Sequence, residues 1–577
     1  MDTKKITRIS VTLLFLATVL LSLVPVVQTL LKGAYAGVPP AYVDDDIYYY
    51  GRMKEVTDRR PFLSNPYFVE YSDARPGAFF VADWLAATPL FLSRNFSVAI
   101  VFNVVFWSLI CVFLAYLLAR ATNIPPPFSA VIALVSYIEV YWLILRPVAM
   151  QEVFPFFLLF LLALLGWLRN PLRRRSIWFL IIASASSFYI YTFLWQITSI
   201  TLGLVFLRML VQKRWPEVKM LLWVALGAGL LSLPAIIYIF HQINAPFYWE
   251  TLGRMNLVES RLPSMDAYYY GRWAAVLTAL YICARKWLIN RSLDDAIVMS
   301  SAIYSGSALF IASIANIFIG KDLATGQHIG RFITLWVALF FPISIWIFWL
   351  FRKELQRWHW LKLGIIGLLS LACFGFLVSN LKRSLPFREI ATIDSASIQG
   401  YAEPLHWLEQ HEKQPTVIWA NKEVSMYVPI LTKHYVFWAP AGGLFIMPTK
   451  EVEDRFLASW VGKLTVEEIL ASYKAFEGSG VFSRYADSFN KNRLSCLIGG
   501  DCRPNQGLRE WIGEETLNQL LKRHIELKKD MQSVMKEYGV SYLISDSARA
   551  GEDAYFKSLP GASPVWKNDR FVIYAVK

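Results

Sequence analysis

The chain has 577 residues, of which 56% are hydrophobic and only 17% are charged, and it contains 22 Trp, 28 Tyr and 39 Phe. Soluble domains average about 45–50% apolar and about 25% charged residues. This composition therefore excludes a disordered chain, a collagen, a coiled coil and a small disulfide-rich protein. The formal net charge of +14 would by itself be compatible with nucleic-acid binding.

The apolar residues fall into runs of about 17–25, the length that a helix needs to cross a bilayer. The stretch 78–92 is interrupted by Asp83, and we expect it to form a re-entrant or interfacial helix. A longer apolar stretch is divided near Tyr191 into two helices. In all, eleven transmembrane helices are predicted, at 8–31, 96–119, 127–145, 151–169, 175–191, 193–211, 217–240, 273–289, 295–319, 329–351 and 358–380.

Lys and Arg are distributed unevenly between the loops. With the N-terminus inside, the inner segments carry 19 Lys and Arg but only 5 Asp and Glu, so the whole charge excess lies on one side. Cytoplasmic loops of membrane proteins carry such an excess. The charge therefore predicts a topology rather than nucleic-acid binding, and the odd number of spans places residues 381–577 outside.

Residues 381–577 differ from residues 1–380, because charges become frequent and apolar runs shorten to strand length. Cys496 and Cys502 share one loop, where either a disulfide, suited to an oxidising compartment, or two free thiols are expected. The pattern indicates a C-terminal α/β domain on the outer face. Strands are predicted at 416–420, 435–438, 542–545 and 571–576, and helices at 403–410, 466–476 and 508–538.

Three adjacent carboxylates, Asp44, Asp45 and Asp46, lie in the first outer loop (33–95), before an aromatic run that ends at Arg52. Adjacent carboxylates repel one another, so at least one is expected to have a cation partner or to be protonated more readily. At a membrane surface such a cluster suits a general base or a metal ligand. The alternative is an Asp cap that opens an amphipathic helix in the membrane interface.

Other outer loops bring ionisable residues close to the bilayer. Arg146 and Glu152 follow the third predicted helix, and Lys321, His328 and Arg331 follow the ninth. Ionisable residues at membrane depth are costly and by default mark a functional pathway. The alternative for His328 and Arg331 is an interface anchor, and for Glu152 a carboxylate stabilised by a helix N-terminus.

The sequence resembles the GT-C superfamily of membrane glycosyltransferases, which take sugars from polyprenyl-phosphate carriers. The segment from Asp46 to Arg52, Asp-Ile-Tyr-Tyr-Tyr-Gly-Arg, is similar to the Asp-x-Tyr-Tyr-x-x-Arg start of oligosaccharyltransferase catalytic subunits. Asp44 and Asp45 followed by Tyr48 are similar to the Asp-Glu-x-x-Tyr of protein mannosyltransferases and lipid A aminoarabinose transferases. The two alignments select different aspartates. The Trp-Trp-Asp-Tyr-Gly signature of oligosaccharyltransferases is absent from the sequence, so recognition of an Asn-x-Ser/Thr peptide is not expected.

The resemblance implies a hexosyl or pentosyl transferase that inverts the anomeric carbon in one in-line step. Its general base would be Asp45 or Asp46, with Asp44 beside them. Asp46 with Glu152 would hold Mg²⁺ or Mn²⁺, which prefer oxygen ligands, although some relatives need no metal. Cations would hold the leaving phosphate, and the candidate substrate-binding residues are Arg331, His328, Lys321, Arg52, Tyr48 and Arg146.

The predicted partners are a polyprenyl-phosphate sugar donor, membrane lipid and an acceptor that is a glycan, a lipid or a protein. The predicted location is the plasma (inner) membrane, with a cytoplasmic N-terminus and an extracytoplasmic C-terminal domain. Two other functions stay open, a polysaccharide ligase or polymerase and a lipid-linked-glycan transporter. Spans that are nearly free of charge argue against the transporter, and the acidic first loop argues against the ligase.

Overall fold

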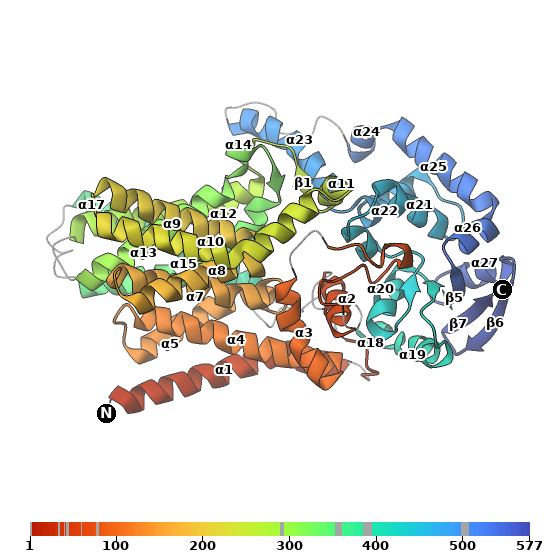
Figure 1. Cartoon of the computed structure of the whole chain (residues 1–577), viewed down its shortest axis with the longest axis horizontal. Helices are drawn as coiled ribbons and strands as arrows, with labels where there is room; N and C mark the ends of the chain where they lie inside the picture. Colours follow the sequence, from red (N-terminus) through yellow and green to blue (C-terminus); the bar gives the residue numbers. More distant parts are fainter. Residues whose placement is uncertain are drawn as a thin grey trace.

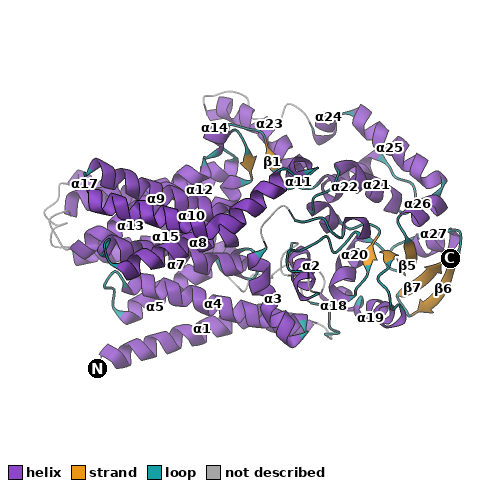
Figure 2. Cartoon of the chain, in the orientation of Figure 1, coloured by secondary structure: helices purple, strands orange, loops and turns teal. Residues whose placement is uncertain are grey.

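The computed structural model describes residues 3–32, 35–39, 41, 45–58, 60–76, 80–288, 293–351, 360–384, 395–497 and 507–577. Figure 1 shows a bundle of long helices at one end of the long axis and a smaller part, which contains the C-terminus, at the other. Figure 2 shows that the strands lie in this smaller part, apart from a short ribbon at the rim of the bundle. The ribbon pairs β1 (Leu257–Val258) with β2 (Asp322–Leu323).

Helices occupy the positions of all eleven predicted spans. The break predicted near Tyr191 is confirmed, because Tyr191 is an extended residue between two helices. Among the described residues, eight helices are long and apolar enough to cross a membrane, and α5, α8 and α12 are not among these eight. The chain is a multi-pass α-helical membrane protein. The helices are α1 (Thr3–Lys32), α4 (Phe96–Arg120), α5 (Pro126–Glu139), α7 (Met150–Arg169), α8 (Arg174–Ile190), α9 (Thr192–Val211), α10 (Trp215–Ile243), α12 (Met265–Leu288), α13 (Leu293–Ser313), α15 (Thr325–Leu350) and α17 (Trp360–Ser384).

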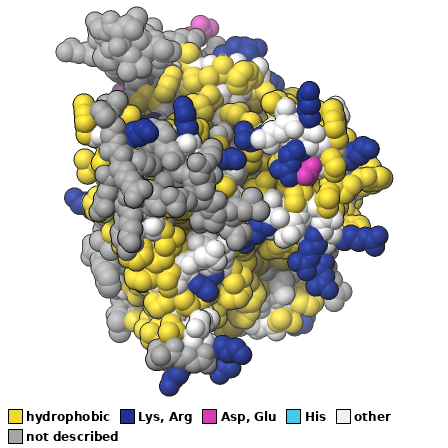
Figure 3. All heavy atoms as spheres, turned by 90° about the vertical axis from the view of Figure 1, so that its left-hand side faces the viewer, with side chains coloured by type: hydrophobic (Ala, Val, Ile, Leu, Met, Phe, Trp, Pro, Cys, Tyr) yellow, Lys and Arg dark blue, Asp and Glu magenta, His cyan; other side chains and the backbone are white. Residues whose placement is uncertain are grey.

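The end of the bundle where α1 begins is basic. Figure 3 views this end and shows many Lys and Arg side chains with few acidic ones among the described residues. Three helices that were predicted to end inside carry arginine in their last turn: Arg120 in α4, Arg169 in α7 and Arg208 in α9. The distribution agrees with the predicted charge asymmetry, while the orientation in the membrane stays a prediction.

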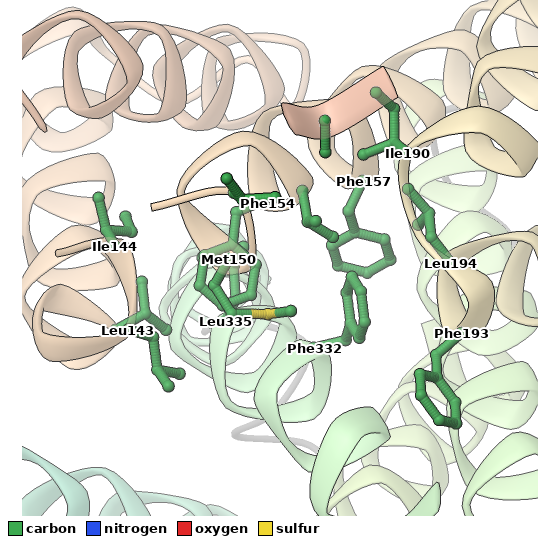
Figure 4. Close-up of a cluster of buried hydrophobic side chains, with 14 of the residues drawn as sticks. Leu143, Ile144, Met150, Phe154, Phe157, Ile190, Phe193, Leu194, Phe332 and Leu335 are labelled. Carbon is green, nitrogen blue, oxygen red and sulfur yellow. The ribbon is translucent and has the colours of Figure 1, made fainter. Parts of the chain in front are cut away.

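Helices α7 and α15 form the centre of the bundle. Figure 4 shows Phe154 and Phe157 of α7 close to Phe332 of α15, and the Phe157 and Phe332 rings lie 5.2 Å apart. Helix α12 approaches α15 closely because Gly330 has no side chain, since a Cβ there would lie 2.3 Å from the ring of Tyr270. This packing fixes the first two turns of α15, which carry two of the predicted site residues.

The first outer loop forms two short helices, α2 (Asp46–Thr57) and α3 (Val81–Ser93), and a short 3-10 turn, η1 (Val69–Tyr71). The helix predicted at 78–92 is confirmed over 81–92, while its re-entrant or interfacial placement stays a prediction. Helix α2 begins directly after Asp45, although Asp45 makes no side-chain cap hydrogen bond and eight of the 12 residues of α2 are buried. Its place in the membrane interface stays a prediction. Helix α2 lies between α3 and α20 (Lys422–Leu431) of the C-terminal part.

The C-terminal part is an α/β domain with a five-stranded sheet of order β4–β3–β5–β7–β6. Strand β3 is parallel to β4 and β5, and β7 is antiparallel to β5 and β6. The four predicted strands are confirmed. Strand β6 was missed because it contains Pro564 and is largely exposed at the sheet edge. The strands are β3 (Val417–Trp419), β4 (Tyr435–Val436), β5 (Val540–Asp546), β6 (Ala562–Lys567) and β7 (Phe571–Val576).

Helices surround this sheet. The single helix predicted at 508–538 is wrong, because Gly513 (φ 91°) and Asp530 divide the segment into three helices. Cys502 and the side chain of Cys496 lie outside the described residues, so the disulfide stays a prediction. Besides α20, the helices are α18 (Ser395–Gln399), α19 (Ala402–His411), α21 (Thr449–Ser459), α22 (Val466–Glu477), α23 (Gly480–Leu497), α24 (Leu508–Ile512), α25 (Glu514–Lys529), α26 (Met531–Glu537) and α27 (Glu552–Ser558), with a 3-10 turn η2 (Pro440–Leu444).

The first outer loop contacts the α/β domain through hydrogen bonds that involve the backbone of the domain. The side-chain amide of Asn65 donates to the carbonyl of Gly442 at 3.1 Å, and the amide of Val436 donates to the carbonyl of Tyr67 at 2.7 Å. A second clamp comes from α11 (Tyr248–Arg254), where the buried guanidinium of Arg254 donates to carbonyls on either side of Phe445. The loop, α11 and the domain therefore pack as one interface.

Gly442 is a sensitive point of this interface. A Cβ at Gly442 would lie 2.4 Å from the ring of the buried residue Phe68. We expect Gly442→Ala to lower the free energy of unfolding by about 1–3 kcal/mol, because a buried ring must move. Gly507→Ala, at a glycine with open space around it, is the control. Equal stabilities of the two variants in a detergent unfolding titration would contradict this packing.

Candidate functional site

Asp45 and Asp46 occupy different environments at the start of α2. The carboxylate of Asp45 is 46% exposed and forms an ion pair with Arg146. Asp46 is completely buried, and its charge acts on the hydroxyl of Tyr427 from α20. Asp44 lies outside the described residues. Of the two described aspartates, Asp45 is the one that a substrate can reach.

Arg146 lies in the short loop before α7, after the one-turn helix α6 (Tyr141–Ile144). Its guanidinium contacts Asp45, donates to the hydroxyl of Tyr49 at 3.4 Å, and lies 5.2 Å from the centre of the Tyr49 ring. The loop is strained, because Val148 has φ 62° although it is β-branched. Such strain persists only where the surroundings impose it and is concentrated at functional sites.

His328 and Arg331 lie one turn apart on α15 and therefore share a face. The hydroxyl of Tyr191, at the junction of α8 and α9, hydrogen-bonds Nδ1 of His328 and also interacts with Arg331. The His328 ring stacks on Phe193 with ring centres 4.5 Å apart. These contacts hold the imidazole and direct Arg331 toward Tyr191.

The two arginines belong to one cluster. The charge of Arg331 acts on Arg146, on Tyr49 and on His328. Burial and the nearby Arg331 together lower the pKa of Arg146 to about 10. Within the described part of the chain no carboxylate forms an ion pair with Arg331, and the buried Nε of Arg146 has no hydrogen-bond partner. We call Arg146, Tyr49, Tyr191, His328 and Arg331 the cationic cluster; it is suited to an anion.

Arg52, which was predicted with Tyr48 to bind substrate, contacts a buried acid, and the substrate role of both residues stays a prediction. The guanidinium of Arg52 lies 2.6 Å from a carboxylate oxygen of Asp83 in α3 and donates to the hydroxyl of Tyr48 at 3.1 Å. Burial alone would lower the pKa of Arg52, but Asp83 and Tyr48 raise it above its ordinary value. The pair ties α2 to α3 beneath the exposed carboxylate of Asp45.

Glu152 lies in the first turn of α7 and is completely buried. Neither of its carboxylate oxygens accepts a hydrogen bond of good geometry, but the backbone amides of Glu152 and Val148 and the charge of Asp83 act on it. The predicted pairing of Glu152 with Asp46 at a metal ion stays a prediction. Within the described ranges, no group of three or more His, Cys, Asp or Glu side chains is placed to hold a metal ion.

Lys321 lies apart from the cationic cluster. Its ammonium nitrogen is 3.7 Å from the centre of the Trp249 ring and 4.0 Å from a carboxylate oxygen of Glu259. The structure thus brings together Asp45, Arg146, His328 and Arg331 of the predicted residues and adds Tyr49 and Tyr191. The helix break at Tyr191 was the available signal for the latter, and the polar interruption at Asp83 was the signal for the partner of Arg52.

Comparison with known proteins gives structural similarities only, because no family model and no curated protein matches the sequence. The crystal structure of ArnT from Cupriavidus metallidurans bound to undecaprenyl phosphate is 12% identical, with 98% of each chain covered and a TM-score of 0.44. That of the Archaeoglobus fulgidus oligosaccharyltransferase tethered with an acceptor peptide is 11% identical, covers 98% of this chain and 74% of that one, and has a TM-score of 0.40. The same organism's AglB, in complex with an inhibitory peptide and a dolichol-phosphate, is 10% identical over the same shares, with a TM-score of 0.39. Because these TM-scores are low, the argument about function rests on the site itself.

Proposed function

We propose that the chain is a membrane glycosyltransferase that moves a sugar from a polyprenyl-phosphate carrier to an acceptor. The observation that carries this proposal is the cationic cluster of Arg146, His328 and Arg331 beside the exposed carboxylate of Asp45. The reaction requires stabilisation of the anionic phosphate as it leaves and an acceptor for the hydroxyl proton, and adjacent side chains could supply both.

In the proposed step, an acceptor hydroxyl attacks the anomeric carbon while the bond from that carbon to the phosphate oxygen breaks. The hydroxyl proton passes to the carboxylate of Asp45, and the electron pair of the broken bond stays on the phosphate. Arg331 and Arg146 stabilise the growing phosphate charge, with Arg suited to a bidentate contact. Attack opposite to the leaving group inverts the anomeric centre.

We also propose that the protein lies in the plasma membrane in the orientation that the charge asymmetry predicts, with its N-terminus in the cytoplasm. Residues 1–380 would form the transmembrane domain, and residues 381–577 would form a separate domain outside. The basic end of the bundle in Figure 3 supports this orientation. A Mg²⁺ or Mn²⁺ ion would find oxygen ligands at the buried carboxylate of Glu152, with which no charged side chain pairs among the described residues. The step above is written with protein groups alone.

The experiment is a transfer assay with purified protein in nanodiscs and a panel of radiolabelled polyprenyl-phosphate hexoses and pentoses, with and without EDTA. Consumption of one donor with transfer of its label supports the proposal, and loss of transfer in EDTA assigns a metal to the reaction. Folded protein that consumes none of the donors would contradict the proposal. Movement of an intact donor across a sealed bilayer would favour the transporter.

Replacing Arg331 tests the phosphate contact. We expect Arg331→Met to raise the Kd for undecaprenyl phosphate about 10- to 100-fold, since charge-assisted hydrogen bonds are lost. Arg331→Lys retains the charge without the bidentate geometry and should fall between the wild type and Arg331→Met. Arg94→Met, at an exposed outer arginine, is the control. Unchanged affinity in Arg331→Met, measured by native mass spectrometry, would contradict this role.

A further inference from the structure

A pocket of about 460 Å³ lies at the outer rim of the bundle and shares only Lys321 with the predicted site residues. Its polar lining consists of Trp249 of α11, Glu259, Lys321, and Arg484 and Asp487 of α23. Nothing in the proposed transfer step uses these side chains. The pocket is therefore a separate feature at the junction of two outer loops and the α/β domain.

The walls of this pocket are fixed by close backbone packing. A Cβ at Gly480 would lie 1.6 Å from the carbonyl oxygen of Gly253, so α23 meets α11 this closely only because residue 480 is a glycine. Arg484 donates to the same carbonyl at 3.0 Å, and Ser483 donates to the side chain of Asn256 at 2.8 Å. The pocket is a built concavity rather than a gap between loosely placed loops.

The chemistry of the lining suits a saccharide. Trp249 is 47% exposed, and the Lys321 ammonium 3.7 Å from its ring centre holds the indole in place. Two cations and two carboxylates give the lining no net charge, so a phosphate would meet the carboxylates of Glu259 and Asp487, and a lipid tail would meet four charged groups. A pyranose has an apolar C–H face for an aromatic ring and hydroxyls for carboxylates and guanidinium groups.

The pocket connects directly to the helix of the cationic cluster. Lys321 precedes β2, which pairs with β1 through Val258 and Asp322, and α15 starts at Thr325. Arg331 lies six residues into α15, which corresponds to about 9 Å at 1.5 Å per residue. Lys321 lies four residues before the start of α15, so the pocket and the proposed phosphate site are carried by consecutive segments of the chain.

We propose that this pocket binds a pyranose unit of a saccharide acceptor, with Trp249 against its apolar face and Asp487, Glu259 and Arg484 at its hydroxyls. The assignment of this saccharide as the acceptor rests on the proposed transferase function. The binding of a saccharide does not, because the pocket residues are separate from the cationic cluster.

The test is saturation-transfer NMR and calorimetry of the full chain in nanodiscs with methyl pyranosides, cellobiose, maltose and chitobiose as probes, and with no donor present. We expect at least one probe to bind, and Trp249→Ala to raise its Kd about tenfold through the loss of the aromatic face. Trp178→Ala, at a 60% exposed tryptophan of α8, should bind like the wild type. If Trp249→Ala does not fold, Asp487→Asn replaces it, with an expected loss of about fivefold.

The outcomes separate the two proposals. If none of the probes binds the wild type, or if the Trp249, Asp487 and Trp178 variants all bind like the wild type, the pocket proposal is overturned. Donor consumption by that same protein would leave the transferase in place. Saccharide binding that depends on Trp249 or Asp487, in a protein that consumes no donor, would support the pocket proposal and contradict the proposed transferase function.

Discussion

Asp45→Asn is expected to lower kcat for sugar transfer by about 10²- to 10⁴-fold, the usual contribution of a general base. The amide has nearly the shape of the carboxylate but cannot accept the proton of the attacking hydroxyl. Donor binding should be retained, because Arg146 loses an ion-pair partner that competes with the phosphate. The measurement is single-turnover transfer, with the donor Kd determined separately.

Asp58→Asn is the matched control for Asp45→Asn. Asp58 is 41% exposed, pairs with Lys54, and lies at the opposite end of α2. It should transfer sugar at the wild-type rate. A rate for Asp45→Asn within tenfold of the wild type would exclude Asp45 as the base, and Asp46→Asn would then be tested in its place.

Arg52→Met is expected to have the largest effect on folding, lowering the free energy of unfolding by about 3–5 kcal/mol. It leaves the completely buried carboxylate of Asp83 without the guanidinium that lies 2.6 Å away. Breaking one side of a buried pair is costly because the remaining charge stays in a medium of low dielectric constant. The measurement is unfolding by SDS titration in mixed micelles.

The double variant Arg52→Met, Asp83→Leu separates a structural role from a substrate-binding role. Replacing both partners with apolar side chains removes the uncompensated charge, so much of the lost stability should return. Arg60→Met, at a 42% exposed arginine that pairs with Glu55, is the control and should cost under about 1 kcal/mol. A fully stable Arg52→Met protein that fails to bind donor would instead support the predicted substrate contact.

The membrane helices could be predicted because their signal is local. A run of apolar side chains long enough for the bilayer specifies a span, and all eleven predicted runs are helical. Even the division at Tyr191 was visible, because the apolar stretch was too long for one helix. The α/β domain was harder to predict from the sequence. Strand β6 lies at an exposed edge, and Gly513 alone did not reveal that the helical pattern from residue 508 onward is interrupted.

The site depends on contacts that the sequence order hides. Asp45 meets Arg146 across about a hundred residues, and Arg331 reaches Tyr191 from a distant helix. The burial of the helix that follows the aspartates could not be predicted, because α20, which packs on it, comes more than 350 residues later. The residue types were therefore predictable, while the pairing of Arg52 with Asp83 and the separate place of Lys321 needed the fold.

A structure of the wild-type protein in nanodiscs with undecaprenyl phosphate tests the central claim most directly. The claim predicts that the phosphate lies within hydrogen-bond distance of the guanidinium groups of both Arg146 and Arg331. It also predicts that the carboxylate of Asp45 faces the phosphate side of the cluster. A phosphate bound elsewhere, with Arg146 and Arg331 contacting only protein groups, would contradict the assignment of this cluster as the carrier site.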